Sequence, residues 1–138
     1  MHTAIRAFIA TLYELISGAE NEPRDWGRWE GLFAKEARLH IIDYDGVLKS
    51  VTTKEWIADY EKQFNGNSSP AFYEYELSSD ISVKGNVIHV MSEYASTLDM
   101  NEEPFKVGYN SFQLIPSGDS FKVVSIFWDR NYNSLNIK

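Results

Sequence analysis

Residues 105–130 constrain the fold of this chain more than any other stretch. Two runs rich in Val, Ile, Phe, Tyr and Trp, FKVGYNSFQLIP and SFKVVSIFWDR, flank a short turn at Ser117-Gly118-Asp119. Such runs around a Gly-containing turn predict two long strands paired as a hairpin. Large apolar side chains alternate onto both faces of both strands, and strands of this kind need cover on two sides. The rest of the chain must supply that cover.

Three helices are predicted upstream of this hairpin. Apolar residues at three- and four-residue steps near the N-terminus indicate an amphipathic helix that ends near Gly18. Asp25 can cap a second, short helix. The residues expected on its buried face are Trp26, Trp29, Leu32 and Phe33. Thr52 and Glu55 form a capping box, which opens a third helix with Trp56 on its buried stripe.

Four further strands are predicted. Arg38–Asp43 and Val47–Val51 are joined by a tight turn, since Asp45-Gly46 supplies the positive φ angles that such turns require. Phe72–Val83 and Val87–Asp99 are longer strands. Strict alternation in the first of these indicates one buried and one solvated face. Expected on its buried face are Tyr73, Tyr75, Leu77, Ile81 and Val83. Expected on its solvated face are Glu74, Glu76, Ser78, Asp80 and Ser82.

Helices followed by a meander of long strands indicate an α+β fold in which helices cover one face of a curved sheet. The 138 residues suit one domain over 1–138. A net charge of −7 without a basic cluster argues against nucleic acid as a partner. With no apolar run long enough to span a membrane, no cysteine and no signal-peptide pattern, we expect a cytoplasmic protein that does not bind membranes.

The order of these elements resembles the nuclear transport factor 2-like superfamily, in particular its SnoaL-like branch. The resemblance rests on the first-helix pattern, on Leu32-Phe33-Ala34-Lys35-Glu36-Ala37 before a strand, and on the terminal hairpin. It implies a cone-shaped, cystatin-like roll, in which a curved antiparallel sheet wraps around a pocket closed by the three helices of the N-terminal half. It also implies a homodimer through the sheet, and the apolar outer positions of the last hairpin favour the same arrangement.

Enzymes of the superfamily place a carboxylate, tyrosine or histidine in an apolar cavity for acid-base work. Ketosteroid isomerase, one such member, uses an Asp base with a Tyr and a protonated Asp as oxyanion donors. Here Tyr13 is offset by about two positions, and Asn110 stands near the place of the late acid. The isomerase activity therefore does not carry over residue by residue.

Asp43 and His40 are the sharpest catalytic candidates, because both lie on the first predicted strand. Positions three apart on a strand point to opposite faces, so a bulge is needed to pair them. The alternatives are a hairpin-turn carboxylate for Asp43 and a core or edge histidine for His40. His2, His40 and His89 have no metal-ligand spacing, so no metal is expected, and no cofactor either.

Aromatic residues with polar tips give a different signal. Each one alone is ordinary core, but together with polar residues in apolar strands they indicate a pocket lining, since their polar atoms need partners. The predicted ligand-binding residues are Tyr13, Trp29, Trp56, Tyr60, Tyr75, Tyr94, Asn110 and Trp128. Three functions stay open: a protein that binds a small hydrophobic ligand, a lyase or isomerase acting on a small hydrophobic carbonyl compound, and a protein-interaction module.

Overall fold

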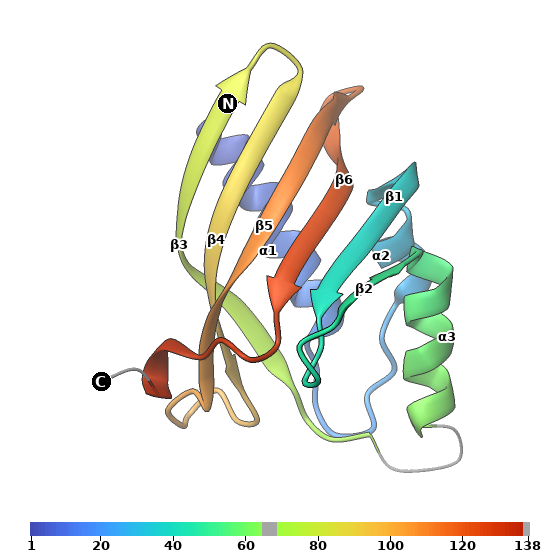
Figure 1. Ribbon diagram of the computed structural model, residues 1–138, viewed down its shortest axis with the longest axis vertical. Helices are drawn as coiled ribbons and strands as arrows, with labels where there is room; N and C mark the ends of the chain where they lie inside the picture. The colour runs from blue at the N-terminus through green and yellow to red at the C-terminus, as the bar shows by residue number, and fades with distance from the viewer. Residues whose placement is uncertain (65–68, 137–138) are drawn as a thin grey trace.

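The computed structural model describes residues 1–64 and 69–136, in which three α-helices pack against one six-stranded sheet (Figure 1). The helices are α1 (His2–Ile16), α2 (Trp26–Glu30) and α3 (Thr53–Phe64). The strands are β1 (Phe33–Ile42), β2 (Leu48–Val51), β3 (Tyr73–Lys84), β4 (Val87–Thr97), β5 (Lys106–Ser117) and β6 (Ser120–Asp129). A 3₁₀ turn, η1 (Ser134–Asn136), follows β6. None of the helices described is long and apolar enough to cross a membrane.

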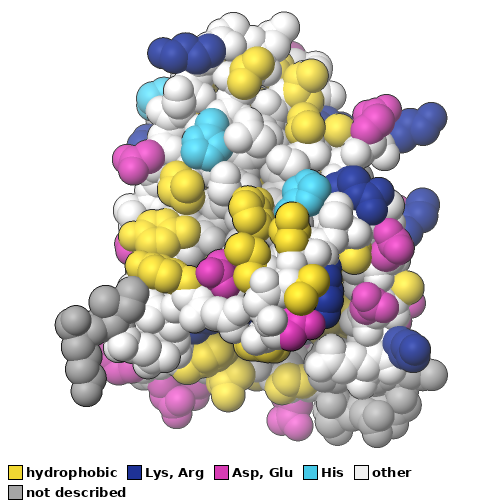
Figure 2. Space-filling model, in the orientation of Figure 1, with side chains coloured by type: hydrophobic (Ala, Val, Ile, Leu, Met, Phe, Trp, Pro, Cys, Tyr) yellow, Lys and Arg dark blue, Asp and Glu magenta, His cyan; other side chains and the backbone are white. Residues whose placement is uncertain are grey.

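The sheet order is β2-β1-β6-β5-β4-β3. Among the described strands β1 and β6 pair in parallel, and the other neighbouring pairs are antiparallel. The expected α+β fold with a curved sheet is confirmed, and the sheet is mixed because of that parallel pair. Helix α1 crosses one face of the sheet, while α2 and α3 lie beside its β1 edge (Figure 1). The opposite face is open and carries scattered apolar side chains (Figure 2).

A bulge in β3 changes which side chains point inward. Glu76 pairs with Tyr94, and Ser78 pairs with the neighbouring Glu93, so Leu77 has no partner in the ladder. An extra residue in one strand bends it and reverses the alternation of its side chains. The expected faces of β3 are therefore wrong for Leu77, which is exposed, and for the residues on its N-terminal side. There Glu74 and Glu76 share the inner face with Ser96 and Tyr94, and Tyr73 and Tyr75 point the other way.

Local capping signals are confirmed. The Asp25 side chain accepts a hydrogen bond from the Arg28 backbone at the start of α2. Thr52 and Glu55 exchange side-chain and backbone hydrogen bonds of 2.9 and 3.1 Å before α3. Helix α2 nevertheless ends at Glu30, and β1 begins earlier than expected.

Phe33 accounts for this difference at the end of α2. It pairs with Val123 of β6, so it belongs to the sheet and not to the helix. Its ring still packs against that of Trp29, with centroids 4.5 Å apart. The contact expected on one helix face is thus made between a helix and a strand, because pairing with a distant strand outweighs local propensity.

The dry core lies under the N-terminal half of α1. Ile5 and Ile9 are fully buried there, against inner-face residues of the central strands. The inner-face residues include Ile88, Val90, Phe112, Leu114 and Val123. Towards its C-terminal end α1 no longer rests on such a layer, because Leu12, Tyr13 and Ile16 border an open space. The interior is therefore packed under the N-terminal half of α1 and contains an open space beside its C-terminal end, called the hollow half below.

Candidate functional site

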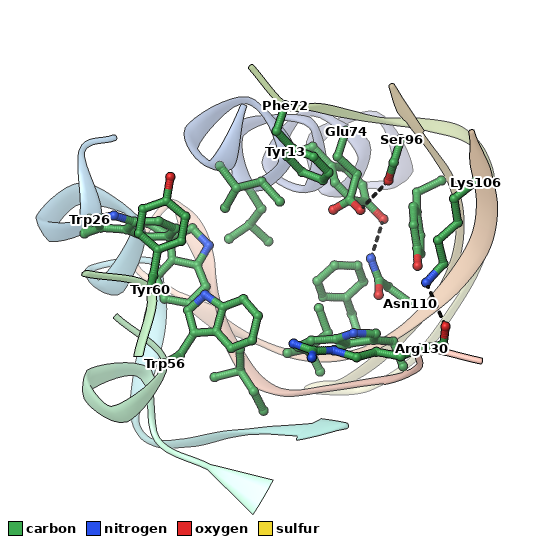
Figure 3. A pocket seen from close by; sticks show the side chains of 18 of the residues that line it. Tyr13, Trp26, Trp56, Tyr60, Phe72, Glu74, Ser96, Lys106, Asn110 and Arg130 are labelled. Atoms are coloured by element: carbon green, nitrogen blue, oxygen red, sulfur yellow. Dashed lines mark hydrogen bonds between the residues drawn. The ribbon is translucent and has the colours of Figure 1, made fainter. Parts of the chain in front are cut away.

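A cavity of about 510 Å³ fills the hollow half, between the three helices and the inner face of the sheet (Figure 3). Its helical wall is aromatic and comes from α2 and α3: Trp26 and Trp29, then Trp56 and Tyr60. The facing sheet wall contains both apolar and polar side chains. The sheet residues and their flanks are Phe33, Leu39, Phe72, Glu74, Tyr94, Ser96, Phe105, Lys106, Asn110, Phe112, Ile126, Trp128 and Arg130.

The aromatic wall is a chain of edge-to-face contacts. Trp26 meets Trp29 with ring centroids 5.3 Å apart and Tyr60 at 4.8 Å. On the far side Trp56 meets Trp128 at 5.6 Å. Aromatic pairs favour such geometry, and each ring restricts its neighbour. These side chains therefore form a firm aromatic surface along one side of the cavity.

A chain of hydrogen bonds connects the sheet wall of the cavity with helix α1 and with strands β4 and β3. Asn110 Nδ2 donates to Tyr13 Oη at 3.1 Å, and Tyr13 Oη lies 2.7 Å from Ser92 Oγ. Ser92 in turn donates to a carboxylate oxygen of Glu76 at 2.5 Å. Because the Ser92 proton is used on Glu76, the Tyr13 hydroxyl must donate to Ser92. Burial, the largest cause, raises the Tyr13 pKa well above its usual value, so this phenol remains protonated.

Glu74 is the acid of the cavity. The Leu77 bulge turns it inward, and the Ser96 hydroxyl donates to Glu74 Oε1 at 3.1 Å (Figure 3). Burial raises the pKa of Glu74 to about 7, although the Ser96 hydrogen bond and the nearby Lys106 ammonium both favour the charged form. A carboxyl group with this pKa exchanges its proton readily at neutral pH.

Two cations border the same space. Lys106 Nζ donates to the Arg130 carbonyl oxygen at 3.3 Å, and burial lowers the Lys106 pKa despite the attraction of Glu74. Arg130 Nη1 lies 3.3 Å from Asp43 Oδ1, and the guanidinium lies over the rings of Tyr44 and Trp56. The cavity wall thus combines one carboxyl group with two cationic side chains.

Tyr94 reaches the cavity across a glycine. A Cβ on Gly108 would lie 2.8 Å from Tyr94 Oη, closer than side chains approach one another. Because Gly108 has no side chain, the Tyr94 phenol has space beside it. Burial, and then the neighbouring Glu74, raise the Tyr94 pKa, which keeps the hydroxyl in its protonated form.

Seven of the predicted ligand-binding residues lie around this cavity. They are Tyr13, Trp29, Trp56, Tyr60, Tyr94, Asn110 and Trp128. The eighth, Tyr75, pairs with Ala95 on the other side of the sheet, because it lies on the N-terminal side of the Leu77 bulge. The prediction that Tyr75 points inward is therefore wrong, and the neighbouring Glu74 points inward instead.

The structure does not bring the two catalytic candidates together. Asp43 follows β1, where hydrogen bonds from Lys49 and from the Tyr44 backbone hold its pKa below the usual value. His40 pairs with Phe127 on the outer face of the sheet, with ring centroids 6.4 Å apart. Neither side chain belongs to the cavity wall formed by the described residues. A catalytic role for them stays a prediction without a geometric basis here.

Three functional candidates were missed in the sequence: Glu74, Lys106 and Arg130. Lys106 carried a signal, since it shares strand parity with Asn110 and Gly108 on β5. Glu74 carried none, because the bulge that turns it inward depends on pairing with β4. Within the described residues, no three His, Asp or Glu side chains converge as a metal site requires.

No protein-family model matches the chain, and no curated protein has significant sequence similarity to it. Its fold, however, is shared with solved structures. An NTF-2 like protein of unknown function from Silicibacter pomeroyi is 17% identical, with a TM-score of 0.61 over 92% of both chains. Aln2 from a Streptomyces species is 10% identical, with a TM-score of 0.69 over 94% of this chain and 90% of that one.

A third structure of the same fold is the beta subunit of a putative aromatic-ring-hydroxylating dioxygenase from Novosphingobium aromaticivorans. It is 16% identical, with a TM-score of 0.65 over 94% of this chain and 90% of that one. The protein therefore has the nuclear transport factor 2-like, cystatin-like fold. Identities this low show the fold alone, and one fold supports many unrelated functions.

Proposed function

We propose that the protein binds a small, flat, largely apolar molecule in the cavity between its helices and its sheet. The observation that carries this proposal is the open space of about 510 Å³ beside an aromatic wall. Small-molecule sites have volumes of roughly 300–1,000 Å³ and combine apolar walls with a few polar groups. Trp26, Trp56 and Tyr60 supply flat apolar surface, and Asn110 and Glu74 supply the polar groups.

The same space favours a small ligand over a protein partner for this site. An interaction module would be expected to have the cone filled by its own tryptophans. Here the four tryptophans lie around an open space and do not fill it.

The experiment is a thermal-shift screen of bicyclic aromatic amides, alcohols and ketones, followed by calorimetric titration of the best binder. Trp56→Ala removes part of the aromatic wall, and we expect it to weaken binding about tenfold or more. Phe127→Ala is the matched control, because Phe127 lies on the outer face of the sheet. Equal affinities in the two variants would contradict binding in this cavity.

A second candidate function is acid-base catalysis on a hydrophobic carbonyl compound. The observation that favours it is the Glu74 carboxyl, with a pKa of about 7, facing the cavity beside Lys106. The carboxylate could accept a proton from the carbon next to a carbonyl group. The test is exchange of deuterium at that carbon in 2-tetralone. Glu74→Gln should abolish exchange and Asp43→Asn should not, while no exchange above the buffer rate removes this candidate.

We also propose that a second copy of the chain covers the outer face of the sheet. Met91, Tyr109 and Phe127 expose apolar surface there, and each has 37–43% of its surface accessible. Figure 2 shows several groups of apolar side chains on this face, with polar and charged side chains between them. Exposed apolar groups on a sheet face favour association, since burying them releases bound water.

A further inference from the structure

In the part of the chain that the structure describes, the cavity is lined by more cationic than anionic side chains, although the protein as a whole is acidic. The chain has a net charge of −7, but the described residues that line the cavity include Lys106, Arg130 and one carboxyl group, Glu74. Glu74 and Lys106 lie on the side of the space away from Trp26 and Tyr60 (Figure 3). Trp26 and Tyr60 thus form one side of the cavity, Glu74 and Lys106 lie on the opposite side, and the Arg130 guanidinium lies over the ring of Trp56.

Both cations have unused hydrogen-bonding capacity. Lys106 Nζ has three N–H donors, and its one hydrogen bond within the described residues is to the Arg130 carbonyl oxygen at 3.3 Å. The Arg130 guanidinium has five N–H donors, and its one hydrogen bond in the same part of the chain is to Asp43 at 3.3 Å. Stacking of the guanidinium over Trp56 and Tyr44 holds it in place without using those donors.

We propose that the cavity selects an organic acid with a flat aromatic body, whose carboxylate lies between Lys106 and Arg130 while its rings lie against the tryptophans. This inference rests on the binding function proposed above and adds the chemical class of the ligand. Charge-assisted hydrogen bonds to a carboxylate are stronger than those between neutral groups, and a cavity out of bulk water strengthens them further. A neutral ligand would not give Lys106 and Arg130 these charge-assisted hydrogen bonds.

Glu74 makes the binding of an acid depend on pH. Groups from every neighbouring element face it: Tyr13 from α1, Tyr94 and Ser96 from β4, and Lys106 from β5. Glu76 lies on the same strand, and Arg130 follows β6. A bound carboxylate would repel an ionised Glu74, and with the Glu74 pKa near 7 protonation relieves the repulsion at little cost.

The sign of this pH dependence follows from linkage. The bound anion raises the Glu74 pKa further, so the complex holds more protons than the free protein. Binding of the acid takes up about half a proton near pH 7 and approaches one proton at higher pH. The affinity for the acid therefore falls as the pH rises above about 7, by up to about tenfold per pH unit.

The test is isothermal titration calorimetry with 2-naphthoate and its neutral isostere 2-naphthamide, in phosphate and in Tris buffer at about pH 6 and about pH 8. The inference predicts that naphthoate binds more tightly than naphthamide at the lower pH. It also predicts that the heat of naphthoate binding depends on the buffer, because the buffer supplies the proton. The naphthamide heat should not depend on the buffer.

Three variants refine the test. Lys106→Gln should weaken naphthoate binding about tenfold and leave naphthamide binding unchanged. Glu74→Gln should remove the proton uptake and the pH dependence. Lys84→Gln, in an exposed position at the end of β3, is the matched control and should change neither ligand.

The outcomes separate the two proposals. Tight binding of naphthamide with weaker binding of naphthoate at both pH values overturns the selection of an acid and leaves the binding function standing. Naphthoate binding without proton uptake in the wild-type protein overturns the role of Glu74, whether or not the Glu74→Gln variant folds. Failure of both probes, and of the wider aromatic panel, overturns the binding function itself.

Discussion

The Ser96 hydroxyl donates a 3.1 Å hydrogen bond to the Glu74 carboxylate inside the cavity, across two strands that pair at these same two residues. A hydrogen bond to the ionised form lowers a carboxyl pKa, yet burial outweighs it here and the pKa is about 7. The pair therefore presents a proton acceptor that is about half ionised at neutral pH. The unbound protein carries this carboxyl group at a cost to its stability.

That cost gives the first prediction. The folded-state pKa of Glu74 is raised from 4.5 to about 7, so the folded protein holds a proton that the unfolded chain releases between those values. The stability that the raised Glu74 pKa contributes is fully present below pH 4.5 and is lost as the pH rises to about 7. We expect Glu74→Gln to gain stability relative to wild type over this interval, by no more than about 3 kcal/mol.

Urea denaturation of both proteins at several pH values between about 4 and 8 measures this difference. Glu102→Gln is the control, because Glu102 is exposed in the loop between β4 and β5. A difference between Glu74→Gln and wild type that stays constant with pH would show that the Glu74 pKa is not raised in the folded protein.

The second prediction concerns the Asn110, Tyr13 and Ser92 hydrogen bonds. Tyr13→Phe removes the acceptor of Asn110 and leaves that buried amide unsatisfied, which we expect to cost about 1–3 kcal/mol of unfolding free energy. Tyr132→Phe, on an exposed tyrosine after β6, should change stability by less than about 0.5 kcal/mol. Equal small effects of the two substitutions in urea denaturation would contradict the described network.

Gly108 gives the third prediction. Gly108→Ala places a methyl group against Tyr94 Oη and should destabilise the protein by about 1–3 kcal/mol. Tyr94→Phe removes the hydroxyl, the atom nearest to the new methyl group, so the double variant should recover part of the loss. The check is a double-mutant cycle by chemical denaturation. Strictly additive effects would mean that the two positions do not touch.

Local signals in the sequence predicted much of the fold. Thr52 with Glu55, and Asp25, cap the helices that they were expected to cap, because capping depends on residues only three positions apart. The aromatic wall was also predicted, since residues such as Trp29 and Trp56 follow the helical period. Long strands were also found where they were expected, although a bulge interrupts the alternation of β3.

What could not be predicted depends on pairing between distant strands. The Leu77 bulge can be recognised only from the pairing of β3 with β4. It places Glu74 on the inner face, where Tyr75 was expected. The early start of β1 likewise depends on pairing of Phe33 with Val123, far along the chain. Sequence periodicity therefore predicted the aromatic half of the candidate site and misplaced its acid.

The fourth prediction concerns the outer face of the sheet. If a second copy covers it, light scattering after size-exclusion chromatography should give twice the chain mass of 15.9 kDa. Phe127→Asp should shift this species to the monomer, because it buries a charge in an apolar interface. Val47→Asp, on an exposed residue of the β1–β2 turn, is the control. A wild-type monomer at micromolar concentration would remove the proposed dimer.

The measurement that tests the binding proposal most directly is a proton–nitrogen NMR titration followed at the indole N–H signals. The chain has four tryptophans, and all of them, Trp26, Trp29, Trp56 and Trp128, border the cavity. We predict that 2-naphthoate or 2-naphthamide moves these indole signals along saturable curves with a common dissociation constant. Indole signals that stay in place up to millimolar ligand, for these probes and for the wider panel, would contradict a ligand-binding cavity.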